Sequence, residues 1–137
     1  MKISSRGIYA IDLMVDLALY DIGDPISVKE IARRQQISGK YLEQIVSMLQ
    51  KAGMVSSIRG AQGGYRLKKK PEEYSIGSIL RVTEGDLAPV ACVEEGETGC
   101  ANRSTCSTIK IWQKLNSAIN EVVDNISLAD LVEWNNK

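Results

Sequence analysis

Apolar residues recur along most of this chain at intervals of three and four, which places them on one face of a helix. The pattern predicts helices over residues 5–20, 28–34, 39–51, 76–84 and from about 107, with a short last helix ending near 134. Residues 54–58 and 67–70 instead predict two strands around a turn rich in glycine and arginine. We therefore expect a mainly α protein with one small β-hairpin.

The first predicted helix is apolar around most of its circumference. The side that we expect to be buried includes Ile8, Ile11 and Val15, and it is broadened by Ala10, Leu13, Met14 and Leu17. Asp12 and Asp16 belong to the remaining narrow polar stripe. A polar stripe on an otherwise apolar helix normally faces solvent. We expect both carboxylates to be exposed.

Serine residues mark the starts of three helices, because a serine hydroxyl can accept a hydrogen bond from a free amide of the first turn. Ser27 and Glu30 form a capping-box pair before the second helix, Ser38 precedes the third, and Ser75 precedes the fourth. The second and third helices are separated by a short break, and the hairpin follows directly. This order predicts a winged helix-turn-helix, in which the third helix enters a major groove of DNA and the hairpin, hereafter the wing, reaches a minor groove.

The third helix has a polar face that is free to contact DNA. Glu43 and Gln44 can bond cytosine or adenine, and Lys40 can meet guanine or phosphate. Arg59 in the wing is suited to a narrow minor groove, and the wing glycines let the backbone approach phosphate. Our DNA-binding candidates are Lys2, Ser38, Lys40, Glu43, Gln44, Arg59, Gly60, Gly63, Gly64 and Tyr65.

The net charge of zero hides an uneven distribution. Residues 29–70 hold ten Lys and Arg against two Glu (+8), residues 71–137 hold five against eleven acids (−6), and residues 1–28 hold two against four (−2). A basic middle that coincides with the helix-turn-helix and wing favours a phosphate-binding face over an ordinary solvated charge run. No apolar run approaches the roughly 20 residues of a membrane span, and the start lacks a signal-peptide pattern. We expect a cytoplasmic protein with no membrane partner.

Three cysteines, Cys92, Cys100 and Cys106, lie in a loop of little periodicity over residues 86–106, hereafter the cysteine segment. Structural disulfides are rare in cytoplasmic proteins, and the gaps of seven and five residues exceed those of a zinc knuckle. Three thiolates suit zinc or an iron-sulfur cluster, and the spacing alone leaves that choice open.

The long helix from residue 107 has more apolar surface than a small domain needs. It can pack on its own domain, but a helix of some 20 residues spans about 30 Å, so we favour pairing with a second subunit. The expected dimer residues are Trp112, Leu115, Ile119 and Val122. A two-fold dimer would present two recognition helices to a palindromic operator.

The chain thus divides into three predicted regions. Residues 1–85 form the winged helix-turn-helix, residues 86–106 form the cysteine segment, and residues 107–137 form the dimerisation helix and a short terminal helix.

The segments MKISSRGIYAIDLMVDLA and SGKYLEQIVSMLQKAGMVSSIRGAQGGYRL resemble the Rrf-two family of bacterial winged-helix regulators, which includes the IscR, NsrR and CymR types. The resemblance covers nearly the whole chain and rests on YLEQ, the stretch ending in GMV, and IRGxxGGY. Cluster-binding members have three cysteines in the same loop, and other members lack them. The resemblance therefore implies an iron-sulfur cluster at the three cysteines, [2Fe-2S] rather than [4Fe-4S].

The fourth cluster ligand cannot be carried over from the family. The histidine that IscR-type members use corresponds to Ile109, and the acid that NsrR-type members use corresponds to Ile8. Asp12, one turn further along, is the remaining candidate and could reach across a dimer; the alternative is a merely solvated carboxylate. The first cysteine gap is also longer than the usual family pattern.

The resemblance implies a homodimeric transcription regulator, most often a repressor, that controls iron-sulfur cluster homeostasis. Regulation by nitric oxide or redox state, or of cysteine metabolism, are alternatives within the family. An iron-sulfur redox or cluster-transfer protein is the alternative from another class. Since the chain has no histidine, no nucleophile-base pair and no phosphate loop, we do not expect an enzyme.

Overall fold

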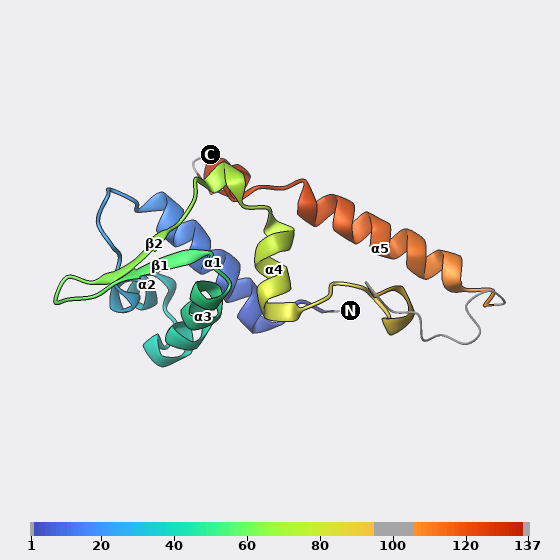
Figure 1. Cartoon of the computed structure of the whole chain (residues 1–137), viewed down its shortest axis with the longest axis horizontal. Helices are drawn as coiled ribbons and strands as arrows, with labels where there is room; N and C mark the ends of the chain where they lie inside the picture. Colours follow the sequence, from blue (N-terminus) through green and yellow to red (C-terminus); the bar gives the residue numbers. More distant parts are fainter. Residues whose placement is uncertain (1, 95–105, 136–137) are drawn as a thin grey trace.

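The computed structural model describes residues 2–94 and 106–135, which fold into a winged helix-turn-helix with one extended helix (Figure 1). This confirms the predicted fold class. The elements in chain order are α1 (Ser5–Leu19), α2 (Val28–Gln35), α3 (Gly39–Lys51), β1 (Val55–Ile58), β2 (Gly64–Leu67), the 3-10 turn η1 (Pro71–Glu73), α4 (Ile76–Glu84), the 3-10 turn η2 (Ala91–Val93), α5 (Ile109–Asp124) and α6 (Leu128–Asn135).

The predicted serine caps are present in the structure. The hydroxyl of Ser27 accepts a hydrogen bond from the amide of Glu30 at 3.2 Å, and the hydroxyls of Ser38 and Ser75 accept equivalent bonds at the starts of α3 and α4. Ahead of α6, the side chains of Ser127 and Asp130 each accept from the amide of the other, at 3.1 and 2.9 Å. These local bonds explain why the helix starts could be found from sequence.

The core lies where α1 packs against α3, α4 and α6. The buried face of α1 consists of Ala10, Leu13, Met14 and Leu17. The burial of these four residues is as we expected. Our expectation was wrong at two positions, because Ile8 is 52% exposed and Asp16 is only 2% exposed. The physical reason is that Asp16 has charged and polar partners on α2, which makes its burial possible.

The wing is an antiparallel pair in which Val55 lies opposite Leu67 and Ile58 opposite Gly64. Its return strand begins at Gly64, earlier than the 67–70 segment that we expected. Tyr65 also exchanges two backbone hydrogen bonds with Ile26, of 2.8 and 3.0 Å, so this part of the chain is paired on both sides. This additional pairing fixes the base of the wing on the segment that precedes α2.

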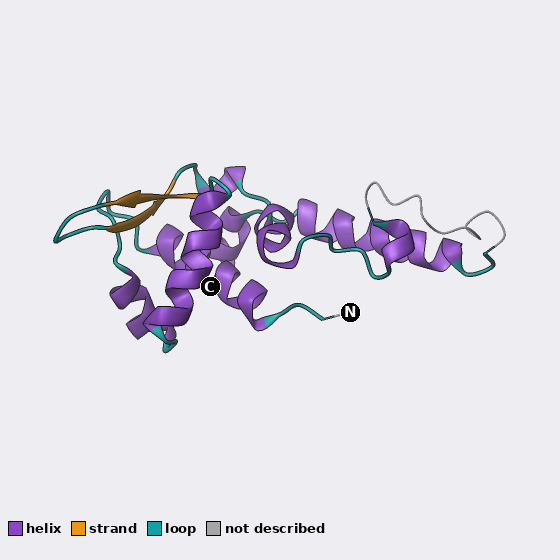
Figure 2. Ribbon diagram, turned by 60° about the horizontal axis from the view of Figure 1, so that its bottom comes forward, coloured by secondary structure: helices purple, strands orange, loops and turns teal. Residues whose placement is uncertain are grey.

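The last helix returns to the core, whereas α5 extends away from it (Figures 1 and 2). Backbone hydrogen bonds from Ile76 to Ile126 and from Leu128 to Tyr74 dock the start of α6, and Leu128 is fully buried. The terminal helix that we grouped with the dimerisation helix therefore packs with residues of the winged helix. No described residue of α5 is fully buried. None of the described helices has the length and apolar character needed to cross a bilayer.

Candidate nucleic-acid interface and cysteine segment

The exposed face of α3 carries the residues that we expected to read DNA. Lys40, Glu43 and Gln44 are exposed, while Leu42 and Ile45 on the same helix are fully buried. Ser38 is also exposed, and its hydroxyl accepts a hydrogen bond from the amide of Tyr41 at 3.2 Å. Tyr41 packs against the core and meets Tyr9 edge to face at 5.7 Å between ring centroids. Tyr41 is therefore a core residue, and the DNA contacts of the other residues stay a prediction.

The helix before it, α2, is held to α1 by a partly buried ion pair. The guanidinium of Arg34 donates to both carboxylate oxygens of Asp16, at 2.7 and 3.0 Å, and the amide of Gln35 adds a third bond at 3.3 Å. Arg34 also lies 4.0 Å above the ring of Tyr20. Because a bidentate pair fixes direction as well as distance, this contact orients α2 on α1. No periodicity in the sequence indicates this contact, since the partners lie on different helices.

The tip of the wing is exposed at Arg59 and at Gly60, whose φ of +121° favours glycine. The next two glycines are required by the wing itself. A Cβ on Gly63 would collide with the carbonyl of Ile58, and one on Gly64 would collide with the carbonyl of Ile26. These glycines therefore have a structural role whether or not the backbone also approaches phosphate.

Tyr65 differs from the other wing candidates because it is half-buried and packs against the core. Its backbone exchanges hydrogen bonds with Ile26. This places Tyr65 at the base of the wing, where it supports the strand, and its predicted contact with DNA is not tested.

Tyr74 anchors the other side of the wing base and was missed by sequence analysis. Its hydroxyl donates to the carbonyl of Met54 at 2.6 Å and accepts from the amides of Lys68 and Lys69, both at 3.0 Å. The side chain is buried, and burial raises its pKa, an effect that the two amide hydrogen bonds oppose. One hydroxyl thus joins the start and the end of the wing.

Lys2 lies in the extended segment before α1 and is exposed. Together with the start of α3 at Tyr41, it lines a hollow of about 740 Å³ that extends to α4 and α5. Lys2 therefore borders the same hollow as Tyr41, and its contact with a DNA backbone stays a prediction.

Two of the three cysteines lie within the described residues. Cys92 is half-buried in η2, and Cys106 precedes α5, where hydrogen bonds from the hydroxyl and amide of Thr108 lower the pKa of its thiol. A lowered pKa favours the thiolate, which is the form that binds metals. Cys100 falls outside the described residues.

Within the described ranges 2–94 and 106–135, no three Asp, Glu, His or Cys residues gather as a metal site. Asp12, the candidate fourth ligand, is half-buried on α1, and burial raises the pKa of its carboxyl. The two described thiols suit a cluster in their chemistry, since sulfur ligands favour iron-sulfur centres.

The long helix α5 has two apolar faces. Ile119 and Val123 pack against the core of their own chain. Val122, by contrast, is 57% exposed and Ile111 is 54% exposed. Of our expected dimer residues, Ile119 therefore faces its own domain, Val122 faces outward, and Trp112 and Leu115 are half-buried.

Comparison with known proteins agrees with this architecture. The model of the Rrf2 family, described as an iron-dependent transcriptional regulator, matches residues 3–134. The chain is 40% identical to the HTH-type transcriptional regulator IscR of Aliivibrio salmonicida over 96% of this chain and 77% of that protein. It is 41% identical to the HTH-type transcriptional regulator CymR of Bacillus subtilis, over 98% of this chain and 91% of that protein.

The solved structure of CymR (YrzC), the global cysteine regulator of B. subtilis, superposes with a TM-score of 0.80 at 40% identity, covering 98% of each chain. Relatives of both the IscR and the CymR type are thus similar to this chain to nearly the same degree. With a family match over almost its whole length and a shared winged-helix fold, the chain belongs to the Rrf2 family of helix-turn-helix transcriptional regulators.

Proposed function

We propose that this protein is a homodimeric repressor that binds a palindromic operator, and that an iron-sulfur cluster at Cys92, Cys100 and Cys106 modulates its affinity for DNA. The observation that carries the proposal is the division of the molecule into two ends. The helix α3 and the wing lie toward one end, and α5 extends toward the other (Figures 1 and 2). Lys40, Glu43 and Gln44 are exposed on α3. A regulator needs this separation, because DNA and the second subunit must bind different surfaces.

The DNA-binding end combines positive charge with groups that can read bases. Glu43 and Gln44 offer an acceptor and an amide to the major groove, and Lys40 offers a cation near the helix start. Arg59 projects from a wing whose base is fixed by Tyr74. Phosphate contacts would supply most of the affinity, and α3 would supply the sequence preference.

The outward face of α5 supports the dimer. Ile111, Leu115, Ala118 and Val122 recur at spacings of four, three and four, which is the pattern of a helix that pairs with another helix. Val122 and Ile111 are exposed in the isolated chain. The inward face, with Ile119 and Val123, already packs on its own core. The second apolar face is therefore available to a second copy of α5.

The cluster is supported by the residues at the two borders of the cysteine segment. Cys92 and Cys106 would hold it together with Cys100, and the hydrogen bonds from Thr108 favour the thiolate of Cys106. When bound, the cluster would supply a centre whose presence depends on iron, sulfide and oxidants. Similarity to IscR relatives and the iron-dependent description of the family support a role in iron-sulfur homeostasis over a role in nitric oxide or redox sensing. We favour a [2Fe-2S] cluster over [4Fe-4S], with Asp12 as the candidate fourth ligand.

Regulation of cysteine metabolism is the second candidate function. It is favoured by the similarity to CymR, the global cysteine regulator of B. subtilis. Three cysteines close together in the sequence favour cluster binding, because they provide thiolate ligands for an iron-sulfur cluster. Regulation of cysteine metabolism would not require these ligands.

Iron content and the visible absorption spectrum of protein purified without oxygen distinguish the iron-sulfur regulator from the regulator of cysteine metabolism. Iron bound to wild type but lost on replacing all three cysteines by Ala supports the cluster. Protein without iron that still binds a palindromic duplex indicates the cysteine-metabolism reading. DNA binding is measured by fluorescence anisotropy against pools of palindromic duplexes. Protein that binds iron and sulfide but none of these duplexes would indicate a redox or cluster-transfer protein.

A base-preference measurement tests the DNA-reading face. Glu43→Ala should change the preferred base at one position of each half-site, because it removes an acceptor from the major groove. Glu72→Ala, an equal change of charge on an exposed residue of η1, serves as the control. Identical base preferences in Glu43→Ala and wild type would contradict the assignment of α3 as the recognition helix.

A further inference from the structure

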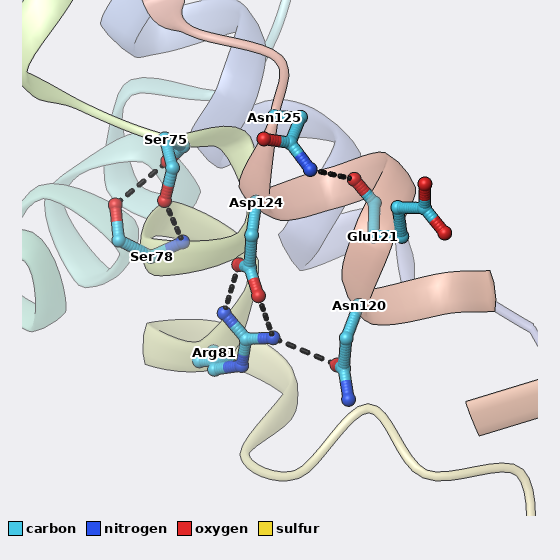
Figure 3. Close-up of polar contacts among 7 residues, drawn as sticks. All are labelled: Ser75, Ser78, Arg81, Asn120, Glu121, Asp124 and Asn125. Atoms are coloured by element: carbon cyan, nitrogen blue, oxygen red, sulfur yellow. Dashed lines mark hydrogen bonds and ion pairs between the residues drawn. The ribbon is translucent and has the colours of Figure 1, made fainter. Parts of the chain in front are cut away.

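Arg81 joins α4 to α5 through three hydrogen bonds (Figure 3). Its Nη1 donates to Asp124 Oδ1 at 2.6 Å, and its Nη2 donates to Asp124 Oδ2 at 3.2 Å and to Asn120 Oδ1 at 2.9 Å. A guanidinium bonded to both oxygens of a carboxylate has a defined orientation. The contact therefore fixes the rotation of α5 on α4 as well as the distance between them.

Gly77 of α4 leaves the space in which Arg81 and Asp124 meet. A Cβ at this position would collide with Asp124 Oδ1 and would lie 2.6 Å from Arg81 Nη1. Gly77 is itself buried. The close approach of Asp124 thus depends on a residue without a side chain, one turn before Arg81.

The same face of α5 also touches the cysteine segment. Asn116, Asn120 and Asp124 are spaced four residues apart and so lie along one side of the helix. Asn116 Nδ2 donates to the carbonyl of Val93 at 3.4 Å, directly after Cys92. At the other end of this row, Arg81 belongs to α4, which packs on α1 and α3. One face of α5 therefore connects the cysteine segment to the helices that carry the DNA-binding residues.

The exposure of the ion pair between Arg81 and Asp124 indicates that it contributes little to the stability of the fold. The side chains of Arg81 and Asp124 are 37% and 44% exposed, and pairs this accessible to water contribute little to global stability. No described residue of α5 is fully buried, and Ile119 and Val123 provide its apolar packing on the core, which lacks the directional constraint of a bidentate ion pair. The ion pair between Arg81 and Asp124 should therefore affect the placement of α5 more than the free energy of unfolding.

We propose that Arg81 is a positioning residue that sets the angle of α5 on the DNA-binding helices. In the dimer of the proposed function, on which this inference rests, that angle sets the separation of the two recognition helices. Arg81 thereby selects the spacing of operator half-sites without contacting DNA.

Hydrogen exchange of the full-length protein tests the first part of the proposal. Arg81→Ala should accelerate exchange of the α5 amides at residues 116–124 by about tenfold or more, because the helix loses its polar anchor. Arg81→Lys keeps the charge but loses the bidentate geometry, so its α5 amides should exchange at an intermediate rate. Glu121→Gln is the matched control, since it removes one charge from an exposed α5 residue whose side chain points away from Arg81 (Figure 3). Exchange equal to wild type in both Arg81 variants would overturn the proposal.

Binding to duplexes of altered half-site spacing tests the second part. The duplex is first selected from random sequences by wild-type protein, and one base pair is then added or removed at its centre, which rotates one half-site by about 35°. Wild type and Glu121→Gln should lose about tenfold or more in affinity, and Arg81→Ala should lose less than about threefold. Equal losses in all three would overturn the role in spacing. Failure of wild type to select any duplex would refute the proposed function, while the exchange result would still decide whether Arg81 holds α5.

Discussion

Replacing Tyr74 by Phe removes a single buried oxygen atom that joins three backbone groups of the wing base. Its donor bond to the carbonyl of Met54 is 2.6 Å long, and the amides of Lys68 and Lys69 each donate to it at 3.0 Å. The ring is buried, so Phe can occupy the same space. The substitution therefore tests the hydrogen bonds separately from the packing of the ring.

The expected loss of stability follows from the surroundings of the three partners. A hydrogen bond contributes about 0.5–1.5 kcal/mol net, and a buried group left without a partner costs about 1–3 kcal/mol. The amide of Lys68 also donates to the Met54 carbonyl at 3.5 Å, so part of this bonding remains when the hydroxyl is removed. We expect Tyr74→Phe to lower the free energy of unfolding by about 1–3 kcal/mol at pH 7.

The pH dependence of this difference has a defined sign. Because burial raises the pKa of Tyr74 above its ordinary value of 10.0, the folded state holds the phenolic proton more tightly than the unfolded state. This stabilisation is fully present below pH 10 and is lost as the pH rises through the higher folded pKa. The stability advantage of wild type over Tyr74→Phe should be constant at neutral pH and should shrink above pH 10.

Urea unfolding of both proteins across pH 6–11, monitored by far-ultraviolet circular dichroism, measures this difference. The slope of the free energy against urea should be equal in the two proteins, since the folded surface is unchanged. Equal stabilities at pH 7, or an advantage of wild type that does not change up to pH 11, would show that the Tyr74 hydroxyl does not stabilise the wing base.

Three further outcomes follow from contacts in the structure. Asp16→Asn should lower the free energy of unfolding by about 3 kcal/mol in urea titrations, because it leaves the guanidinium of Arg34 without its carboxylate; a loss below 0.5 kcal/mol would contradict the account of α2. Arg59→Ala should weaken operator binding by about 1–3 kcal/mol and reduce the slope of log affinity against log salt by about one, whereas an unchanged slope would exclude the wing tip from the interface. Ile111→Asp combined with Val122→Asp should give folded monomers in sedimentation experiments, because both side chains are exposed in the single chain but would be buried by a partner helix; a persistent dimer would locate the interface elsewhere.

The features that could be predicted from the sequence are those that depend on neighbouring residues. The hydroxyls of Ser27, Ser38 and Ser75 bond amides three residues away, so each helix start has a local signature. The wing likewise depends on short-range glycines and strand residues. The exposed face of α3 followed from its apolar periodicity alone.

The features that escaped prediction depend on partners far along the chain. Asp16 can be buried because it pairs with Arg34, which lies 18 residues further along the chain on another helix. The periodicity of α1 cannot indicate a pairing with another helix. Tyr74 meets Met54 across 20 residues, for which no sequence pattern exists. The apolar positions of α5 were predicted, but their division between an inward face at Ile119 and an outward face at Val122 depends on how α5 sits on α4.

In the proposed function, a cluster at the three cysteines changes the affinity of this regulator for its operator. The direct measurement is the operator affinity of loaded wild type, stripped wild type and the variant with Cys92, Cys100 and Cys106 replaced by Ala, all at one salt concentration. A tenfold change corresponds to about 1.4 kcal/mol of coupling between cluster and DNA. We predict a difference of about tenfold or more between loaded and stripped wild type, with the triple variant equal to the stripped form. Three equal affinities would contradict the claim.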